Sequence, residues 1–300
     1  MSVDIKEYLV RRKQEVEQAL KALLPPDCGP LSRHYEAMRY SLLAGGKRVR
    51  PILCLATAEA MGAKTTPVMP LACALECIHT YSLIHDDLPA MDDDDLRRGM
   101  PTSHKKFGEA AAILAGDGLL SFAFELLSTP LPRGGISPRQ RLEIIHCVAK
   151  AVGPTGMVGG QVLDIEAEGR SDEVDLEDLR LIHRCKTGAL ITAAVQTGAL
   201  AGGADRDRFN ALTQYGRQIG LAFQIVDDLL NVTGETATLG KTAGSDAARG
   251  KATYPALLGI EATRDKAVEA RQAALEALSA FDDRADPLRE LACYIVARTR

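Results

Sequence analysis

Apolar residues recur every three or four positions through almost every segment longer than ten residues. This spacing places them on one face of an α-helix, whereas a strand requires strict alternation, and no alternating run rich in Val or Ile is present. The pattern is clear in 35–44 and 215–230, and segment 71–87 is apolar nearly all round, which is typical of a central buried helix. The sequence therefore predicts an all-α fold.

The helical segments are separated by breaks too short and too apolar to be domain linkers, and no segment repeats another. With 300 residues, 46% of them hydrophobic and 25% charged, the chain can bury one large core. We therefore expect a single domain over residues 1–300, built as a bundle of about ten helices.

Charge and composition narrow the class of partner. A net charge of −4 leaves no global basic field for nucleic acid, so we expect no nucleic-acid partner. No uninterrupted apolar run approaches the roughly 18 residues needed to cross a bilayer, and the N-terminal residues do not resemble a signal peptide. The seven cysteines are scattered and odd in number, as expected where thiols stay reduced. We expect a cytoplasmic protein without a membrane span.

The strongest local signal is a run of acids at the end of the apolar segment 71–87. Six carboxylates lie between Asp86 and Asp95. Two like charges about 4 Å apart repel by roughly 4 kcal/mol at an effective dielectric of 20, so such a cluster favours a cation. All the candidate ligands are oxygens, which suits Mg²⁺ rather than Zn²⁺. Pro89 disfavours helix at the preceding residue, so the chain can turn back and bring Asp92 towards Asp86. The alternative interpretation is a solvated acidic turn.

A second acidic pair, Asp227 and Asp228, ends the apolar segment 215–230, and Asn231 follows one helical turn after Asp227. Two acid-ended helices in an all-α protein could face each other and hold a polyanion through bridging Mg²⁺ ions, because Mg²⁺ usually binds phosphates through only one or two carboxylates. The pattern therefore indicates a diphosphate substrate.

Three basic segments supply complementary charge: 45–51, with two glycines and three cations, 97–99, and 186–188 within an apolar stretch. Each alone could be a solvated face. Residues 240–242 resemble the end of a phosphate-binding Walker loop, but Glu235 occupies the position where that loop needs glycine, so we exclude it.

Five motifs in this order resemble those of the short-chain trans-prenyl diphosphate synthases, and most closely the bacterial farnesyl diphosphate synthases: 45–51, 86–92, 97–99, 186–188 and 223–228. The resemblance covers nearly the whole chain. It implies the isoprenoid synthase fold, an all-α homodimer whose helices surround a deep central cavity. It also implies condensation of isopentenyl diphosphate with dimethylallyl and geranyl diphosphate to give farnesyl diphosphate.

The resemblance further implies roles for individual residues. Three Mg²⁺ ions would be held by Asp86, Asp92 and Asp227, which together with Lys186 would be the catalytic residues. The residues that would contact the allylic diphosphate are Arg97, Lys186, Thr187, Gln224, Lys241 and Lys251. Those that would bind isopentenyl diphosphate are Gly46, Lys47, Arg50, His79 and Arg98.

Product length should depend on the residues below the first acidic motif. Tyr81 lies five residues before Asp86, about 7.5 Å along the helix, and its ring could stop a growing chain, with the small Ser82 beside it. This favours a C15 product. The alternative is that Tyr81 is an ordinary core residue.

Three other functions share parts of this pattern. A geranylgeranyl diphosphate synthase would share all five motifs, and a non-catalytic partner subunit of a related synthase would share the fold. A terpene cyclase would not need Lys47, Arg50 and Arg98 for a second diphosphate, so their presence favours condensation. Asn231 stands where many relatives have Asp, and this neutral ligand could weaken one metal site.

Overall fold

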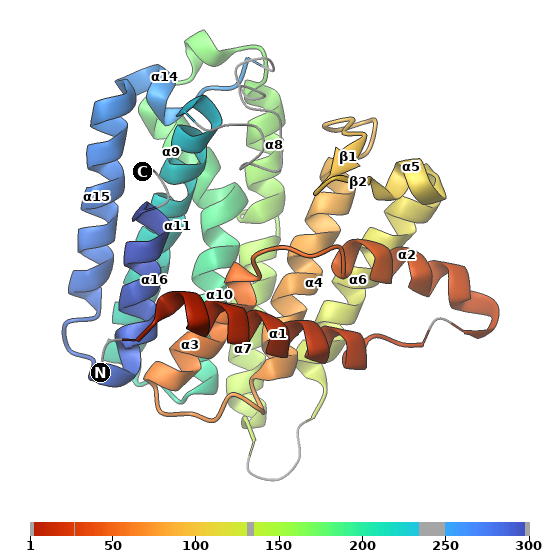
Figure 1. Ribbon diagram of the computed structural model, residues 1–300, viewed down its shortest axis with the longest axis horizontal. Helices are drawn as coiled ribbons and strands as arrows, with labels where there is room; N and C mark the ends of the chain where they lie inside the picture. The colour runs from red at the N-terminus through yellow and green to blue at the C-terminus, as the bar shows by residue number, and fades with distance from the viewer. Residues whose placement is uncertain (1–2, 27, 131–134, 234–249, 298–300) are drawn as a thin grey trace.

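The computed structural model describes residues 3–26, 28–130, 135–233 and 250–297 (Figure 1). Lys241 lies outside these ranges. Within them the chain forms twelve α-helices of eight residues or more. Their bounds are α1 (Ile5–Leu23), α2 (Ser32–Leu42), α3 (Val49–Ala60), α4 (Met69–Asp86), α6 (Glu109–Ser128), α7 (Pro138–Val152), α8 (Met157–Ala167), α9 (Leu176–His183), α10 (Ala189–Ala201), α11 (Arg206–Thr233), α15 (Ile260–Ala277) and α16 (Asp286–Ala297).

The predicted all-α class is confirmed, whereas the predicted number of about ten helices was too low. Two further helices, α5 (Ser103–Phe107) and α14 (Tyr254–Leu258), have only five residues each. Helices as short as these contain too few turns for apolar periodicity to separate them from their neighbours.

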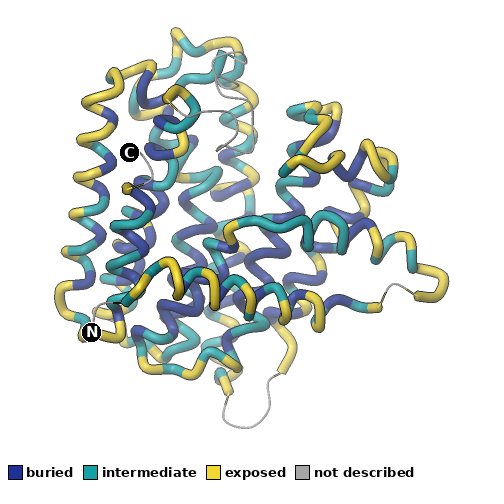
Figure 2. The backbone as a smooth tube through the Cα atoms, viewed as in Figure 1, coloured by how far each residue is buried: buried dark blue, intermediate teal, exposed yellow. Residues whose placement is uncertain are grey.

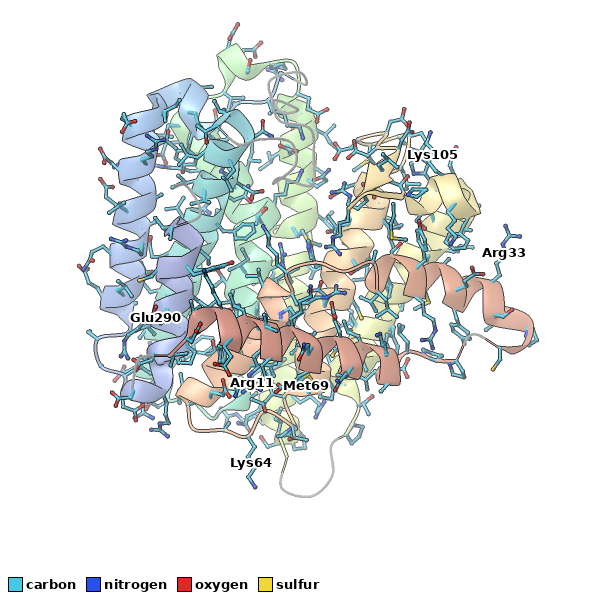
Figure 3. The ribbon with its side chains drawn as sticks, viewed as in Figure 1. Arg11, Arg33, Lys64, Met69, Lys105 and Glu290 are labelled. Carbon is cyan, nitrogen blue, oxygen red and sulfur yellow. The ribbon has the colours of Figure 1, made fainter. Side chains whose placement is uncertain are left out.

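Helix α4 is the centre of the bundle, as its nearly uniform apolar sequence predicts. Eleven of its 18 residues are buried, and it packs most extensively against α6, with α3, α1, α2 and α10 around it. Figure 2 shows this buried interior, with exposed residues on the outer helices and turns. In Figure 3 the labelled Arg33 and Lys64 project outward from the periphery.

Helix α6 alone among the helices of the described residues is long and apolar enough to suit a membrane span. It packs against α4, α2, α5 and α7 in the bundle, and its Asp117 and Glu125 are exposed. These contacts are those of a core helix.

A short hairpin follows the first acidic motif. Strands β1 (Leu96–Arg97) and β2 (Met100–Pro101) pair antiparallel and leave Arg98 and Gly99 as a two-residue turn. Both turn residues have positive φ, 55° and 77°, as the tightest hairpin turns require. Strands of two residues carry no readable alternation, which is why the sequence did not predict them.

The C-terminal ends of α4 and α11 point to the same, upper end of the bundle in Figure 1. These are the two helix ends that carry the acidic motifs. The fold thus places both acidic pairs at one end of the bundle, where the candidate site lies.

Candidate active site

The chain turns back at the end of α4, as Pro89 predicts. The backbone N–H of Asp92 donates to the carbonyl of Asp86 at 2.8 Å. Burial raises the pKa of Asp86 to about 6, with Lys186 pulling it down and Asp92 pushing it up. The two predicted metal ligands of the first motif are therefore electrostatic neighbours.

Asp87 has a different task from Asp86. It is buried, and one of its oxygens accepts hydrogen bonds from Nε of Arg97 at 2.9 Å and from Nη2 of the same guanidinium. Arg97 also lies 3.3 Å from Asp94. The guanidinium that was predicted to contact the allylic diphosphate thus fastens the β1–β2 hairpin to the end of α4.

The acidic end of α11 divides its two carboxylates in the same way. Asp227 is exposed, whereas Asp228 is buried. Asp228 accepts a hydrogen bond from the backbone N–H of Tyr254 at 2.9 Å, and His183 Nε2 lies 3.9 Å from its other oxygen. Burial lowers the pKa of His183 to about 4, so this imidazole is neutral at pH 7. Asp228 therefore anchors α14 to α11.

Two predicted substrate-binding lysines converge on Asp164, a residue of α8 that the sequence analysis missed. Lys186 Nζ lies 2.6 Å and Lys251 Nζ 2.9 Å from the same Asp164 oxygen, and Lys251 also pairs with Glu168 at 3.0 Å. Burial opposes ionisation, yet the two lysines hold the pKa of Asp164 below its usual value. A lone carboxylate in the apolar stretch 157–165 was the available signal.

Lys186 and Thr187 lie on a π-helical turn, Arg184–Gly188. Such turns interrupt α-helices, frequently at functional sites. The backbone of α8 approaches closely here, because a Cβ added to Gly160 would stand 2.1 Å from the amide nitrogen of Lys186. Asp164 follows Gly160 by one helical turn, so this close approach also brings its carboxylate to the Lys186 ammonium.

The residues predicted for isopentenyl diphosphate gather around His79. Burial, followed by the fields of Arg50, Arg98, Arg97 and Arg48, lowers the pKa of His79 well below its usual value, so the ring is neutral. Gly46 lies against the Arg98 guanidinium, to which an added Cβ would come within 2.7 Å, and Arg98 donates a hydrogen bond to the Gly45 carbonyl. Lys47 is exposed beside them.

Electrostatic influence connects the two halves. Burial lowers the pKa of Arg50 to about 10, while Glu76 from α4 and Asp227 from α11 raise it. Arg50 therefore lies within reach of the second acidic end, just as Lys186 lies within reach of Asp86 in the first. The charge of Asp227 thus acts on Arg50, and that of Lys186 on Asp86, whereas the opposition of the two acidic helix ends across a set of cations stays a prediction.

The donor chemistry of this site fits Mg²⁺. The acidic side chains of both helix ends offer oxygen ligands only, the type that Mg²⁺ selects. In the part of the chain that the structure describes, no three acidic, His or Cys side chains are close enough to hold a metal on their own.

The remaining predicted residues are placed as follows. Thr187 and Gln224 are half-buried on the π-turn and on α11. Tyr81 is buried, with its ring edge-on to His85 at 5.5 Å, and the Ser82 hydroxyl donates to the His79 carbonyl at 2.9 Å. Ser82 precedes Asp86 by one turn and so shares its face of α4.

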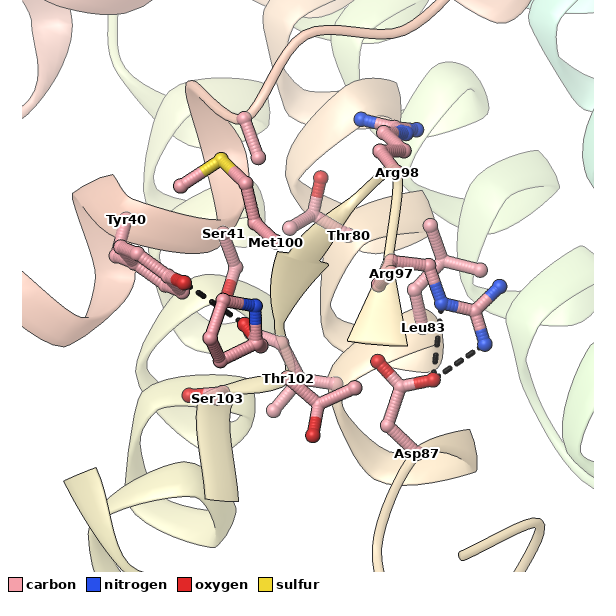
Figure 4. A pocket seen from close by; sticks show the side chains of 13 residues that line it. Tyr40, Ser41, Thr80, Leu83, Asp87, Arg97, Arg98, Met100, Thr102 and Ser103 are labelled. Atoms are coloured by element: carbon pink, nitrogen blue, oxygen red, sulfur yellow. Dashed lines mark hydrogen bonds and ion pairs between the residues drawn. The ribbon is translucent and has the colours of Figure 1, made fainter. Parts of the chain in front are cut away.

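A small cavity of about 30 Å³ lies behind the hairpin, between α2, α4 and β1–β2 (Figure 4). Arg97, Arg98 and Asp87 line it with Thr80, and the Tyr40 hydroxyl closes it by donating to the Pro101 carbonyl at 2.8 Å. Its volume is that of about one water molecule. The hairpin is therefore packed closely against α2 and α4.

Comparison with known proteins identifies the family. The polyprenyl synthetase family model matches residues 32–286. Geranylgeranyl pyrophosphate synthase 11 of Arabidopsis thaliana is 50% identical over 98% of this chain and 82% of its own length. The dimethylallyltranstransferase of Fischerella ambigua is 47% identical over 99% of this chain and 84% of its own. The chain belongs to the polyprenyl synthetase family.

Solved structures agree with this assignment. The apo FPP/GFPP synthase of Zymomonas mobilis superposes with a TM-score of 0.87 at 42% identity, over 99% of this chain and 100% of that one. The fold is thus the isoprenoid synthase fold, and the chain is a trans-prenyl diphosphate synthase.

Proposed function

We propose that this chain condenses isopentenyl diphosphate with allylic diphosphates at the site between α4 and α11. The observation that carries the proposal is the pairing of two acidic helix ends with two separate groups of cations. The charges of Lys186 and Lys251, which meet at Asp164, act on Asp86 and Asp92, whereas those of Arg50 and Arg98 act on His79. Two cation groups match two diphosphates.

Asp86, Asp92 and Asp227 would hold the Mg²⁺ ions, which when bound neutralise negative charge on the diphosphate of the allylic substrate. Lys186 and Lys251 then stabilise the charge that grows on this diphosphate as its carbon–oxygen bond breaks. A fixed donor of this kind is worth about 3–4 kcal/mol. Arg50, Arg98 and neutral His79 orient isopentenyl diphosphate so that its double bond attacks the allylic cation. The proton then lost passes to an oxygen of the released diphosphate, so no protein base is required.

For the product we propose geranylgeranyl diphosphate, C20. The support is sequence similarity over nearly the whole chain to enzymes named for that product, at about 50% identity. A second candidate, farnesyl diphosphate, is favoured by Tyr81, because its buried ring is held against His85 below Asp86.

Incubation with isopentenyl and dimethylallyl diphosphate and Mg²⁺, followed by chain-length analysis, decides between these products. A C20 product that is unchanged in Tyr81→Ala makes Tyr81 an ordinary core residue. A C15 product that lengthens in Tyr81→Ala identifies Tyr81 as the floor of the chain site. Absence of any isopentenyl-dependent product from the purified chain would contradict the proposed function and favour a non-catalytic partner subunit.

We also propose that the chain works as a homodimer. Helix α6 exposes Ile113 by 43% and Leu114 by 58%, and a second copy could cover this apolar surface. Light scattering coupled to size exclusion should give twice the 32.2 kDa chain mass, and Leu114→Glu should shift it towards the monomer.

A further inference from the structure

The segment Gly45–Pro51 carries three cations, but one of them does not face the site. The side chain of Arg48 is fully buried, at 0% exposure, whereas Lys47 is exposed. Arg50 lies near Asp227, on the site side. A run of cations that looks uniform in the sequence is thus divided by the fold.

Arg48 is held by three groups from different parts of the chain. Its Nη1 donates to Glu76 on α4 at 2.7 Å and its Nη2 to the Leu42 carbonyl at the end of α2 at 2.9 Å. Its Nε lies 3.6 Å from Glu17 on α1. The guanidinium therefore ties the segment to α4, α2 and α1 together.

The backbone around Arg48 needs such a tie. Arg48 has a φ of +52°, a conformation that is unfavourable for a residue with a Cβ, and it stands just before the first turn of α3. Gly45 and Gly46 also have positive φ, of 87° and 125°. Strained conformations of this kind persist where surrounding contacts hold them, and they cluster at ligand-binding sites.

Glu76 connects this tie to the site. It is 2% exposed, it precedes His79 by one turn on α4, and its charge acts on Arg50 and Arg98 as well as on Arg48. One buried carboxylate thus influences every arginine that surrounds the neutral His79, apart from Arg97.

We infer that the buried Arg48–Glu76 pair is a positioning device for the isopentenyl diphosphate site. It holds the strained segment so that Lys47 and Arg50 keep their positions at this site, and neither Arg48 nor Glu76 touches the substrate. This inference rests on the proposed function of Lys47, Arg50 and His79. A displacement of about 1 Å of an orienting group is enough to reduce a rate by up to about a hundredfold.

The test is a comparison of the two substrates. Glu76→Gln should raise the KM for isopentenyl diphosphate by about tenfold or more, while the KM for dimethylallyl diphosphate changes by less than about twofold. Arg48→Lys keeps the charge but cannot reach both Glu76 and the Leu42 carbonyl, so it should give an intermediate rise. Partial unfolding by itself would not change the KM for isopentenyl diphosphate selectively.

The matched control is Glu59→Gln. Glu59 pairs with the nearly buried Arg12 and so links α3 to α1, away from the site. This variant should lower stability to denaturant without moving either KM.

If Glu76→Gln fails to fold, the double variant Arg48→Met with Glu76→Leu carries the same test, because it leaves no unpaired buried charge. It should fold and still bind isopentenyl diphosphate at least about tenfold more weakly by calorimetry. Wild-type affinity in either variant, or equal effects on both substrates, would overturn the inference. Failure of the wild-type chain to bind isopentenyl diphosphate would instead overturn the proposed function.

Discussion

The ends of α4 and α11 each carry two adjacent aspartates, but the buried aspartate is bound by a different kind of partner at each end. At each end the first carboxylate is the more accessible of the two, Asp86 being half-buried and Asp227 exposed, and the second is buried in a hydrogen bond. Asp87 is bound by the side chain of Arg97, ten residues further along the chain, whereas Asp228 is bound by the backbone of Tyr254, 26 residues further along. The first end is organised by its own hairpin and the second by a distant helix.

The difference shows why adjacent aspartates are not interchangeable. A carboxylate that faces ions and substrate must stay accessible, whereas one that fastens two elements must be buried and paired. Both pairs place the accessible member first, so that the helix terminus points one carboxylate to the site and turns the next one inward.

The largest effect should come from removing an accessible carboxylate. Asp86→Asn should lower kcat by about a thousandfold, because it removes a ligand of the Mg²⁺ that would neutralise the departing diphosphate. Steady-state turnover at saturating Mg²⁺ measures this. Asp93→Asn is the matched control, since Asp93 is exposed and its φ of +48° suits asparagine equally well. Equal loss in both variants would contradict the division of roles.

The buried members should instead affect stability, and unequally. Asp87→Asn should reduce the free energy of unfolding by about 2–3 kcal/mol, because it removes a charged partner of a largely buried guanidinium. Asp228→Asn should cost only about 1 kcal/mol, since an amide oxygen still accepts from the Tyr254 N–H and His183 is neutral. Urea unfolding at pH 7 compares the stabilities of the two variants. A larger loss in Asp228→Asn would show that the hydrogen bond from the Tyr254 backbone contributes more than the Asp87–Arg97 ion pair.

Replacing Asp164, which pairs with Lys186 and Lys251, should change the free energy of unfolding in a pH-dependent way. Because the pKa of Asp164 is lowered in the folded chain, its ionised form stabilises the fold at neutral pH, and this contribution is lost as the pH falls below about 4. Asp164→Asn should therefore cost about 1–2 kcal/mol at pH 7 and progressively less towards pH 3. Urea unfolding across this range measures the gap, and a constant gap would exclude the ion pairs as its source.

The smallest effect should come from adding a further carboxylate to the end of α11. Asn231→Asp adds a charged oxygen ligand one turn after Asp227, so the Mg²⁺ concentration for half-maximal activity should fall by about threefold. Asn210→Asp makes the same change near the other end of α11 and should leave the Mg²⁺ requirement unchanged. A Mg²⁺ titration of initial rates distinguishes them.

Much of the fold was predictable from local pattern. The buried helix 71–87 corresponds to α4 at Met69–Asp86, and 215–230 lies within α11. The turn at Pro89 follows from a steric rule that acts on the neighbouring residue. The π-helical turn at Lys186 and the β1–β2 hairpin could not be predicted, because neither leaves a periodic signal in so few residues.

The sequence by itself determined which elements and which chemical groups the protein has. The spacing of apolar residues predicted the helices, and the acidic and basic motifs predicted two acidic helix ends with separate groups of cations. Tertiary structure alone decided which charged side chains reach the site. Arg48 turns inward to Glu76, and Asp164 gathers Lys186 and Lys251 from positions 22 and 87 residues away. The physical reason is that burial and pairing depend on which backbones approach in space, and neighbouring residues of identical charge are separated only by that packing.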